Sequence, residues 1–313
     1  MSRGSLADAL NAGVVILDGG LATQLEARGH DLSSTLWSAR LLSDEPDAIV
    51  KAHQAFFDAG AEVATSASYQ ASFSGLGASG VDRAEAARML RLSVQLAQRA
   101  RDAAESGDGR SRFVAASVGP YGAAMADGSE YRGDYGLDVG ALRAWHRPRL
   151  EVLADTGADV LACETVPCLA EAEALVTEVQ RLGTPAWLAL TCSAGLTRAG
   201  EPLEEAFGLV RGVAEVVAVG VNCTDPADVD ALVALAAEAS GKPVVVYPNS
   251  GEAWDARARS WAGSGTLASA SVLGWVDDGA RLVGGCCRVT PDDIAAVRAV
   301  VGERRLAGSG QPR

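Results

Sequence analysis

Short apolar runs alternate with longer amphipathic segments along the whole chain. The short runs are almost continuously hydrophobic and rich in valine, which predicts strands buried on both faces of a parallel sheet. We expect eight strands, at residues 14–17, 62–66, 113–118, 159–163, 186–191, 216–221, 244–247 and 281–284.

The segments between these strands have the spacing of amphipathic helices. Residues 82–105 place Met89, Leu92 and Leu96 on one face, and Asp82 precedes them as a helix-capping residue. Further helices are expected at 46–59, 139–156, 169–182, 203–212, 227–240, 268–278 and 291–301. Eight strand-then-helix units in 313 residues predict an α/β fold of the single (β/α)8 TIM-barrel type. A doubly wound open sheet is the alternative.

Two long segments interrupt this alternation. Residues 119–137 follow the third strand and residues 248–267 follow the seventh, at the ends of strands where barrel enzymes place their active sites. The second segment contains Trp254 and Trp261, which could face a cation or anchor the loop. We expect the barrel domain to cover residues 1–305 and the Gly/Ser-rich residues 306–313 to form a disordered tail.

Charge and composition narrow the class of protein. The net charge of -13 disfavours nucleic acid as a partner, because the phosphate backbone is also negative. The apolar run at residues 14–17 is too short for a signal-peptide core, and no stretch approaches transmembrane length. We therefore expect a cytoplasmic protein that has no membrane partner and whose six cysteines are reduced. In that setting, clustered thiols indicate a metal site or catalysis.

Three cysteines lie at strand ends. Cys286 and Cys287 come directly after the eighth strand in LVGGCCR, and Cys223 follows the sixth in VGVNC. In a barrel these ends share one rim, so we expect three converging thiolates, which suit a catalytic Zn²⁺ site with an open fourth position. Gly284 and Gly285 would let the backbone turn so that both side chains face the ion.

Other polar residues follow other strands. Asp18 and Glu164 come after the first and fourth strands and could bind an ammonium group; the alternatives are a turn cap and a helix-entry charge. Thr65 and Tyr69 follow the second strand, where Tyr69 could contact substrate or simply pack. The remaining cysteines are interpreted as small core residues, and the histidines have no ligand or triad spacing: Cys163, Cys168, Cys192, His30, His53 and His146.

These residues resemble the homocysteine S-methyltransferase family over almost the whole chain. The matching segments are LDGGLATQLEARG, LWSARLL, ATSASYQAS, GPYGAAMADGSEYRGDY, ETVPCLAEAEAL, GVNCTDP, VVYPNSGEAWD and VGGCCRVTPDDI. GVNC followed by GGCC is the most specific combination. The segments SYQAS and ADGSEYRGDY resemble the subgroup that uses S-methylmethionine or S-adenosylmethionine.

The resemblance implies a role for each matching residue. Zinc would be held by Cys223, Cys286 and Cys287. The amino group of homocysteine would contact Asp18 and Glu164, and its carboxylate would lie near Gly19 and Thr65. Tyr69 would lie near the sulfur as a catalytic residue, and Asn222, which precedes the first zinc ligand, would contact the substrate.

The implied reaction moves a methyl group from a small sulfonium donor to homocysteine and forms methionine. S-Methylmethionine is the first expected donor, S-adenosylmethionine the second, and betaine is not expected, because betaine users typically carry extra C-terminal structure. Asp127, Glu130 or Asp134 would lie near the donor's charge. A zinc hydrolase is disfavoured by the all-sulfur ligands. Two alternatives remain: a zinc-binding redox sensor, with Cys286 and Cys287 as its switchable pair, and a homocysteine methyltransferase that uses betaine.

Overall fold

Eight parallel strands form a nearly closed barrel. The computed structural model describes residues 4–32, 37–255, 260–263, 265, 267 and 269–309. In chain order the strands are β1 (Val15–Ile16), β2 (Val63–Thr65), β3 (Phe113–Val118), β4 (Val160–Val166), β5 (Ala186–Leu190), β8 (Val216–Asn222), β9 (Val244–Tyr247) and β12 (Ala280–Val283). Each pairs with the next, β12 pairs with β1, and a parallel bridge between Leu17 and Val63 joins β1 to β2. The barrel prediction is confirmed, and the open sheet is wrong.

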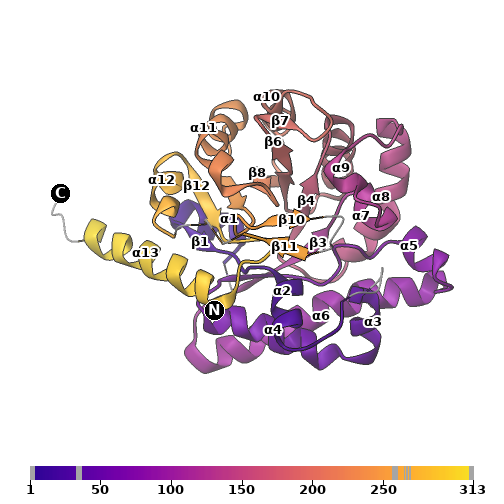
Figure 1. Ribbon diagram of the computed structural model, residues 1–313, viewed down its shortest axis with the longest axis horizontal. Helices are drawn as coiled ribbons and strands as arrows, with labels where there is room; N and C mark the ends of the chain where they lie inside the picture. Colours follow the sequence, from indigo (N-terminus) through magenta and orange to yellow (C-terminus); the bar gives the residue numbers. More distant parts are fainter. Residues whose placement is uncertain are drawn as a thin grey trace.

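Helices surround the barrel (Figure 1). All eight predicted helices are present, with shifted ends: α4 (Pro46–Asp58), α6 (Arg83–Asp108), α8 (Val139–Ala154), α9 (Leu169–Leu182), α10 (Leu203–Gly208), α11 (Val229–Ser240), α12 (Ser271–Asp277) and α13 (Pro291–Ser309). The Asp82 side chain caps α6 by accepting from the backbone N–H of Glu85. Helix α13 continues to Ser309, past residue 306, where a disordered tail was expected; residues 310–313 lie outside the described residues.

Short elements that were not predicted occupy the connections. Helix α1 (Leu6–Ala12) precedes the barrel, and the others follow strands or join helices: α2 (Leu21–Ala27), α3 (Trp37–Asp44), α5 (Phe73–Ala78), α7 (Tyr121–Met125) and the 3₁₀ turns η1 (Ser129–Tyr131) and η2 (Pro226–Asp228). Two hairpins also follow strands: β6 (Cys192–Ser193) with β7 (Leu196–Thr197), and β10 (Ala253–Asp255) with β11 (Ser260–Ala262).

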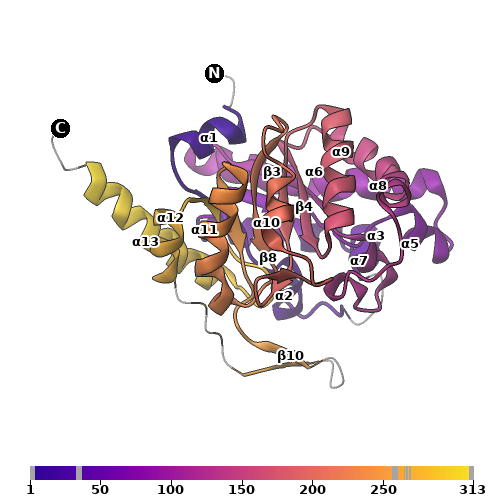
Figure 2. The same ribbon diagram turned by 90° about the horizontal axis from the view of Figure 1, so that it is seen from above.

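The two long segments therefore contain regular structure. Residues 119–137 hold α7 and η1, and residues 248–267 hold the β10–β11 hairpin, which extends beyond the barrel in Figure 2. The side chains of Trp254 and Trp261 lie outside the described residues, so their orientation stays a prediction. No helix in the described part of the chain is long and apolar enough to cross a membrane.

The inside of the barrel changes from apolar to polar toward its carboxyl-end rim. Alternate residues of a strand face the same side, so Val160, Ala162 and Glu164 of β4 point inward together. Val160 and Ala162 belong to the inner apolar cluster, whereas Glu164 comes one step nearer the rim. In β9, Val245 and Tyr247 follow the same pattern. The inward face of each strand therefore delivers polar groups to one end of the barrel.

Candidate active site

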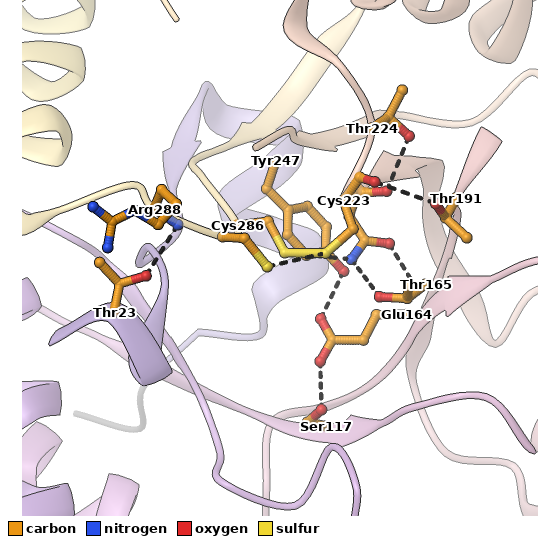
Figure 3. Close-up of a disulfide and its surroundings, with 12 residues drawn as sticks. Thr23, Ser117, Glu164, Thr165, Thr191, Cys223, Thr224, Tyr247, Cys286 and Arg288 are labelled. Carbon is orange, nitrogen blue, oxygen red and sulfur yellow. Dashed lines mark hydrogen bonds between the residues drawn. A yellow bond between two sulfur atoms is a disulfide. The ribbon is translucent and has the colours of Figure 1, made fainter. Parts of the chain in front are cut away.

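The three predicted metal ligands converge on the rim. Cys223 follows β8 and the Cys286–Cys287 pair follows β12, the two strands that flank β9. The three sulfur atoms all lie within 4.8 Å of one another. The structure pairs Cys223 and Cys286 as a disulfide (Figure 3), and the Cys287 sulfur lies 4.0 Å from that of Cys223.

This pairing differs from the one considered in the redox-sensor alternative, in which Cys286 and Cys287 form the switchable pair. The Cα atoms of Cys223 and Cys286 are 5.6 Å apart, inside the usual disulfide range of roughly 4.4–6.8 Å. Adjacent residues such as Cys286 and Cys287 have Cα atoms only about 3.8 Å apart, which is too short for that range. The disulfide therefore joins Cys286 to Cys223 on the other side of the rim and not to its chain neighbour Cys287.

The thiol cluster fits a tetrahedral metal once the disulfide is reduced. Zinc–sulfur bonds of about 2.3 Å place the ligands of a tetrahedral site roughly 3.8 Å from one another. The separations found here, up to 4.8 Å, need only small side-chain rotations to reach that value. Within the described ranges, no fourth histidine, cysteine or carboxylate joins the group. A tetrahedral metal held by these three sulfur atoms would therefore have one coordination position left for a ligand that is not part of the protein.

Left-handed backbone conformations mark the residues around the cluster. Thr165, Cys223 and Arg288 have φ angles of 59°, 48° and 67°, which are unusual for residues other than glycine and rarest for a β-branched threonine. The Arg288 N–H donates to the Thr23 hydroxyl at 3.0 Å, as Figure 3 shows. Strained backbone of this kind persists only where surrounding contacts hold it, and it concentrates at functional sites.

Glycines at the end of β12 have a different role from the one expected. Neither Gly284 nor Gly285 has a positive φ angle, so the turn itself does not require them. A Cβ atom on Gly284 would lie 2.6 Å from the Leu17 Cβ and 2.8 Å from the Asp18 carbonyl oxygen, and one on Gly285 would collide with the Val289 side chain. Gly284 therefore lets the cysteine turn pack directly against the loop after β1, and Gly285 lets it pack against the Val289 side chain.

Asp18 is buried at the end of β1 and faces the second strand. One of its carboxylate oxygens accepts from the Thr65 N–H at 2.7 Å and the other from the Thr65 hydroxyl at 3.0 Å. Burial raises the pKa of Asp18 to about 7, although the two hydrogen bonds lower it. Among the described residues, no lysine, arginine or histidine lies within ion-pair distance of it.

Glu164 is the second buried carboxylate at the rim. It accepts hydrogen bonds from the Ser117 hydroxyl and from the Tyr247 hydroxyl, the latter at 3.0 Å (Figure 3). The Trp187 indole N–H donates to the same Tyr247 oxygen at 3.0 Å. Burial raises the pKa of Glu164 to about 7 against the lowering effect of the two hydroxyls. Like Asp18, it has no cationic partner in the described part of the chain.

Asn222 connects the rim of β8 to the loop after β4. Its amide oxygen accepts from the Thr165 N–H at 2.7 Å, and its amide nitrogen donates to the Thr165 hydroxyl at 2.8 Å. The same nitrogen lies 4.0 Å from the Cys286 sulfur. Asn222 therefore holds the strained Thr165 backbone and contacts the thiol cluster.

One cavity of about 180 Å³ brings the predicted residues together. It is lined by the residues expected to hold the metal and homocysteine: Asp18, Gly19, Thr65, Tyr69, Glu164, Asn222, Cys223, Cys286 and Cys287. Their placement in one cavity is a structural finding, while their individual roles stay predictions. The acids expected near the donor's charge are not among the cavity's lining residues: Asp127, Glu130 and Asp134. The lining also includes Gln70, Ser117, Tyr131 and Tyr247, which were not predicted as site residues. Strand alternation could have found Ser117 and Tyr247, which lie two residues beyond inward-facing Ala115 and Val245.

The remaining cysteines are core residues as expected. Cys163, Cys168 and Cys192 are buried, and burial raises the pKa of each thiol. His146, for which no partner was foreseen, is fully buried, and its Nε2 lies 2.7 Å from a Glu171 carboxylate oxygen.

Replacing Glu164 by glutamine is expected to stabilise the ligand-free protein at pH 8 but not at pH 5. A carboxyl group whose folded pKa is raised from 4.5 to about 7 contributes stability below pH 4.5 that is lost as the pH rises through 7. Glutamine removes the buried charge, and the Ser117 and Tyr247 hydroxyls can turn to suit it. We expect a gain of about 1–3 kcal/mol in the free energy of unfolding at pH 8, measured by urea titration. An equal change at both pH values would contradict this account.

The fold and the cavity together define a (β/α)8-barrel enzyme whose rim carries a thiol cluster able to hold a metal ion. The sequence model of the homocysteine S-methyltransferase family matches residues 15–301. Homocysteine S-methyltransferase YbgG of Bacillus subtilis is 42% identical over 91% of this chain and 94% of its own length. The Escherichia coli homocysteine S-methyltransferase is 46% identical over the same shares. The chain belongs to the homocysteine S-methyltransferase family, and it is a methyltransferase.

Solved structures agree with this assignment. The metallated form of the E. coli homocysteine methyltransferase MmuM superimposes with a TM-score of 0.84 at 41% identity, covering 93% of this chain and 99% of that one. The oxidized form of the same protein gives a TM-score of 0.83 at 42% identity, covering 91% and 95%. The TIM-type fold predicted from the sequence is thereby confirmed.

Proposed function

We propose that this chain transfers the methyl group of a sulfonium donor to the thiol of homocysteine, using Zn²⁺ held by Cys223, Cys286 and Cys287. The observation that carries the proposal is a single cavity that combines three convergent sulfurs with two buried carboxylates lacking a cationic partner among the described residues. Soft sulfur ligands favour zinc, and an outer position remains for a substrate sulfur.

The two carboxylates suit the amino group of homocysteine. Asp18 and Glu164 are buried, and an ionised carboxylate in such a place is unstable unless a cation pairs with it. Burial raises the pKa of both groups for this reason. An ammonium group between them would supply that charge. We place the substrate carboxylate toward Gly19 and Thr65 on the β1–β2 side of the cavity. A cavity of about 180 Å³ has room for one small amino acid.

The transfer requires a thiolate and a positioned methyl group. Bound zinc supplies deprotonation of the incoming thiol, whose free pKa is near 8.5. Asp18 and Glu164 hold the substrate amino group, so that its sulfur points at the cysteines. The substrate sulfur then bonds to the donor methyl carbon while the carbon–sulfur bond of the donor breaks. The electron pair stays on the donor sulfur, which leaves as a neutral thioether. The protein contributes mainly orientation and exclusion of water.

S-Methylmethionine is the proposed first donor and S-adenosylmethionine the second. A sulfonium leaves as a neutral thioether, a better leaving group than the tertiary amine that betaine would release. The test mixes reduced, zinc-loaded enzyme with homocysteine and each donor separately and measures methionine. We expect turnover in the order S-methylmethionine, S-adenosylmethionine, with none from betaine. Turnover with betaine but with neither sulfonium would overturn the proposal.

The disulfide supports oxidation as a second, inhibitory state of the same site. Joining Cys223 to Cys286 removes two of the three ligands, so oxidised enzyme should lose zinc and activity and regain both with reductant plus zinc. Mass mapping of the oxidised protein should recover a peptide pair linked through Cys223 and Cys286. Full activity in protein whose disulfide is complete by that mapping would show that these sulfurs are not the ligands.

A further inference from the structure

A buried arginine, histidine and glutamate form a polar network behind the wall of the cavity. Arg149 and His146 lie on α8 and Glu171 lies on α9; these two helices pack side by side, with α7 next to α8 (Figures 1 and 2). Arg149 Nη2 lies 2.8 Å from His146 Nδ1, and His146 Nε2 lies 2.7 Å from a Glu171 carboxylate oxygen. Burial lowers the pKa of His146 to about 4, so its ring is neutral at pH 7. Because arginine can only donate, Nδ1 accepts, and the ring donates its Nε2 proton to Glu171.

Both ends of this network hold the turn that follows β3. The same Arg149 nitrogen donates to the Gly119 carbonyl oxygen. The same Glu171 oxygen accepts from the Tyr121 backbone N–H at 2.6 Å. The side chains of Arg149, His146 and Glu171 are all buried. Two hydrogen bonds from buried groups on α8 and α9 therefore fix the backbone of this turn.

Gly119 connects the turn to a residue of the cavity wall. A Cβ atom on Gly119 would lie 2.5 Å from the Tyr69 carbonyl oxygen and 2.7 Å from the Tyr69 ring carbon Cδ2, so the Gly119 backbone lies directly against that ring. Tyr69 lines the cavity. Burial raises the pKa of Tyr69 well above its usual value, and a hydrogen bond with the Thr165 side chain opposes this rise. Thr165 is the strained residue that Asn222 holds beside the thiol cluster. A continuous path of contacts thus leads from Arg149 to the cavity wall.

The burial of Arg149 is energetically unfavourable, which indicates a role beyond packing. Its Nε and Nη1 atoms have no hydrogen-bond partner, and no carboxylate lies within ion-pair distance, among the residues that the structure describes. A buried charge with unmatched donors destabilises a fold, and an apolar side chain of similar size would fill the space at lower cost. None of the three network residues lines the cavity. Arg149 can therefore affect a reaction there only through the residues that it holds.

We propose that Arg149 is a positioning residue for methyl transfer, which fixes the Tyr69 ring at the cavity wall through the Gly119 carbonyl group. The inference rests on the proposed function, in which Tyr69 lies near the sulfur of homocysteine. Transfer requires the substrate sulfur in line with the donor's carbon–sulfur bond, and a small displacement of the groups around it lowers the rate strongly. Homocysteine binding depends on Asp18 and Glu164, so Arg149 should act on kcat and have little effect on the KM of homocysteine.

The kinetic test compares Arg149→Met with the matched control Arg147→Met. Arg147 lies on the same helix, is partly exposed and pairs with Glu178, so its loss leaves the network intact. Arg149→Met should lower kcat about tenfold or more, while the KM of homocysteine and the zinc content stay within about twofold. Arg149→Lys should recover part of the loss, because it keeps a donor for the Gly119 carbonyl group. Arg147→Met should leave all three quantities within about twofold. Should Arg149→Met not fold, Arg149→Lys takes its place, with an expected loss of about threefold or more in kcat.

A double-mutant comparison shows whether the effect passes through Tyr69. Tyr69→Phe removes the hydroxyl group and keeps the ring, and in that background Arg149→Met should change kcat by less than about twofold. Nuclear magnetic resonance of protein with labelled tyrosine gives a second readout that needs neither metal nor substrate. The Tyr69 ring signal, identified by its absence in Tyr69→Phe, should shift or broaden in Arg149→Met and stay unchanged in Arg147→Met.

Three results would overturn the assignment. An unchanged Tyr69 signal in Arg149→Met would show that the network does not hold the ring. An equal fall in kcat with and without the Tyr69 hydroxyl group would show that Arg149 does not act through it. A loss of zinc, or a rise in the KM of homocysteine as large as the fall in kcat, would show a general disturbance of the site. Failure of the proposed function is distinct, because the unaltered enzyme would then form no methionine while the Tyr69 signal still reports on the position of the ring.

Discussion

Replacing Cys287 by serine is expected to remove zinc and methyl transfer together while the barrel stays folded. Serine keeps its proton at neutral pH and lacks the soft sulfur that zinc favours, so two thiolates would remain to hold the ion. Cys287 is partly exposed on the rim and lies outside the apolar core. We expect kcat/KM to fall about a thousandfold or more, with circular dichroism and the melting temperature little changed. Elemental analysis gives the zinc content of the purified reduced protein.

Cys168→Ser is the matched control for this variant. Cys168 is a buried cysteine at the N-cap position of α9 and makes no side-chain cap hydrogen bond there. Serine is among the best N-cap residues, so this variant should keep its zinc, its activity and its stability. Full zinc content in Cys287→Ser or in Cys223→Ser would rule out the ligand set.

Asp18→Asn and Glu164→Gln are each expected to weaken homocysteine binding about tenfold or more while zinc remains. Each variant removes a charge-assisted hydrogen bond to the substrate ammonium, worth about 1.5–3 kcal/mol. Titration calorimetry with zinc-loaded protein measures the dissociation constant directly. The structural cost should be small in both variants, because in Asp18→Asn the amide oxygen can accept from the Thr65 N–H while the Thr65 hydroxyl turns to accept from the amide nitrogen. Unchanged homocysteine titrations in both variants would show that the acids are structural.

The pH dependence of binding follows from the same carboxylates. Both have pKa values of about 7, so the ionised form that an ammonium requires is depleted below neutral pH. Binding of methionine, whose thioether carries no proton near neutrality, isolates this effect from thiol ionisation. Methionine should bind more tightly as the pH rises from 6 to 8, and Glu164→Gln should flatten that dependence. A flat profile in the unaltered protein would contradict the assignment.

The barrel could be predicted from the sequence because each strand is a continuous apolar run. Burial of both faces leaves little ambiguity between strand and loop in segments such as 113–118 and 216–221. Helices α2, α5 and α7 were missed because they are only five to seven residues long and lie in connections. In helices this short, tertiary contacts outweigh the periodic pattern that sequence reasoning depends on.

Site residues that follow strands could be predicted from the sequence. Contacts between residues far apart in the chain, such as the disulfide, could not. Cys223, Asp18 and Glu164 were found because strand ends meet on one rim. The disulfide partner of Cys286 could not be predicted, because it depends on the distance between the Cα atoms of Cys223 and Cys286 across the rim. Tyr247 was not predicted as a site residue, because in the sequence it is indistinguishable from the last apolar residue of a buried strand.

X-ray absorption at the zinc edge tests the central claim most directly, because it counts the sulfur atoms around the metal. Reduced, zinc-loaded protein should show three sulfur neighbours at about 2.3 Å and one lighter atom. Adding homocysteine should replace the lighter atom with a fourth sulfur, and Cys287→Ser should give no loaded protein to measure. Fewer than three sulfurs in the free enzyme, or a sulfur count unchanged by homocysteine, would contradict the account.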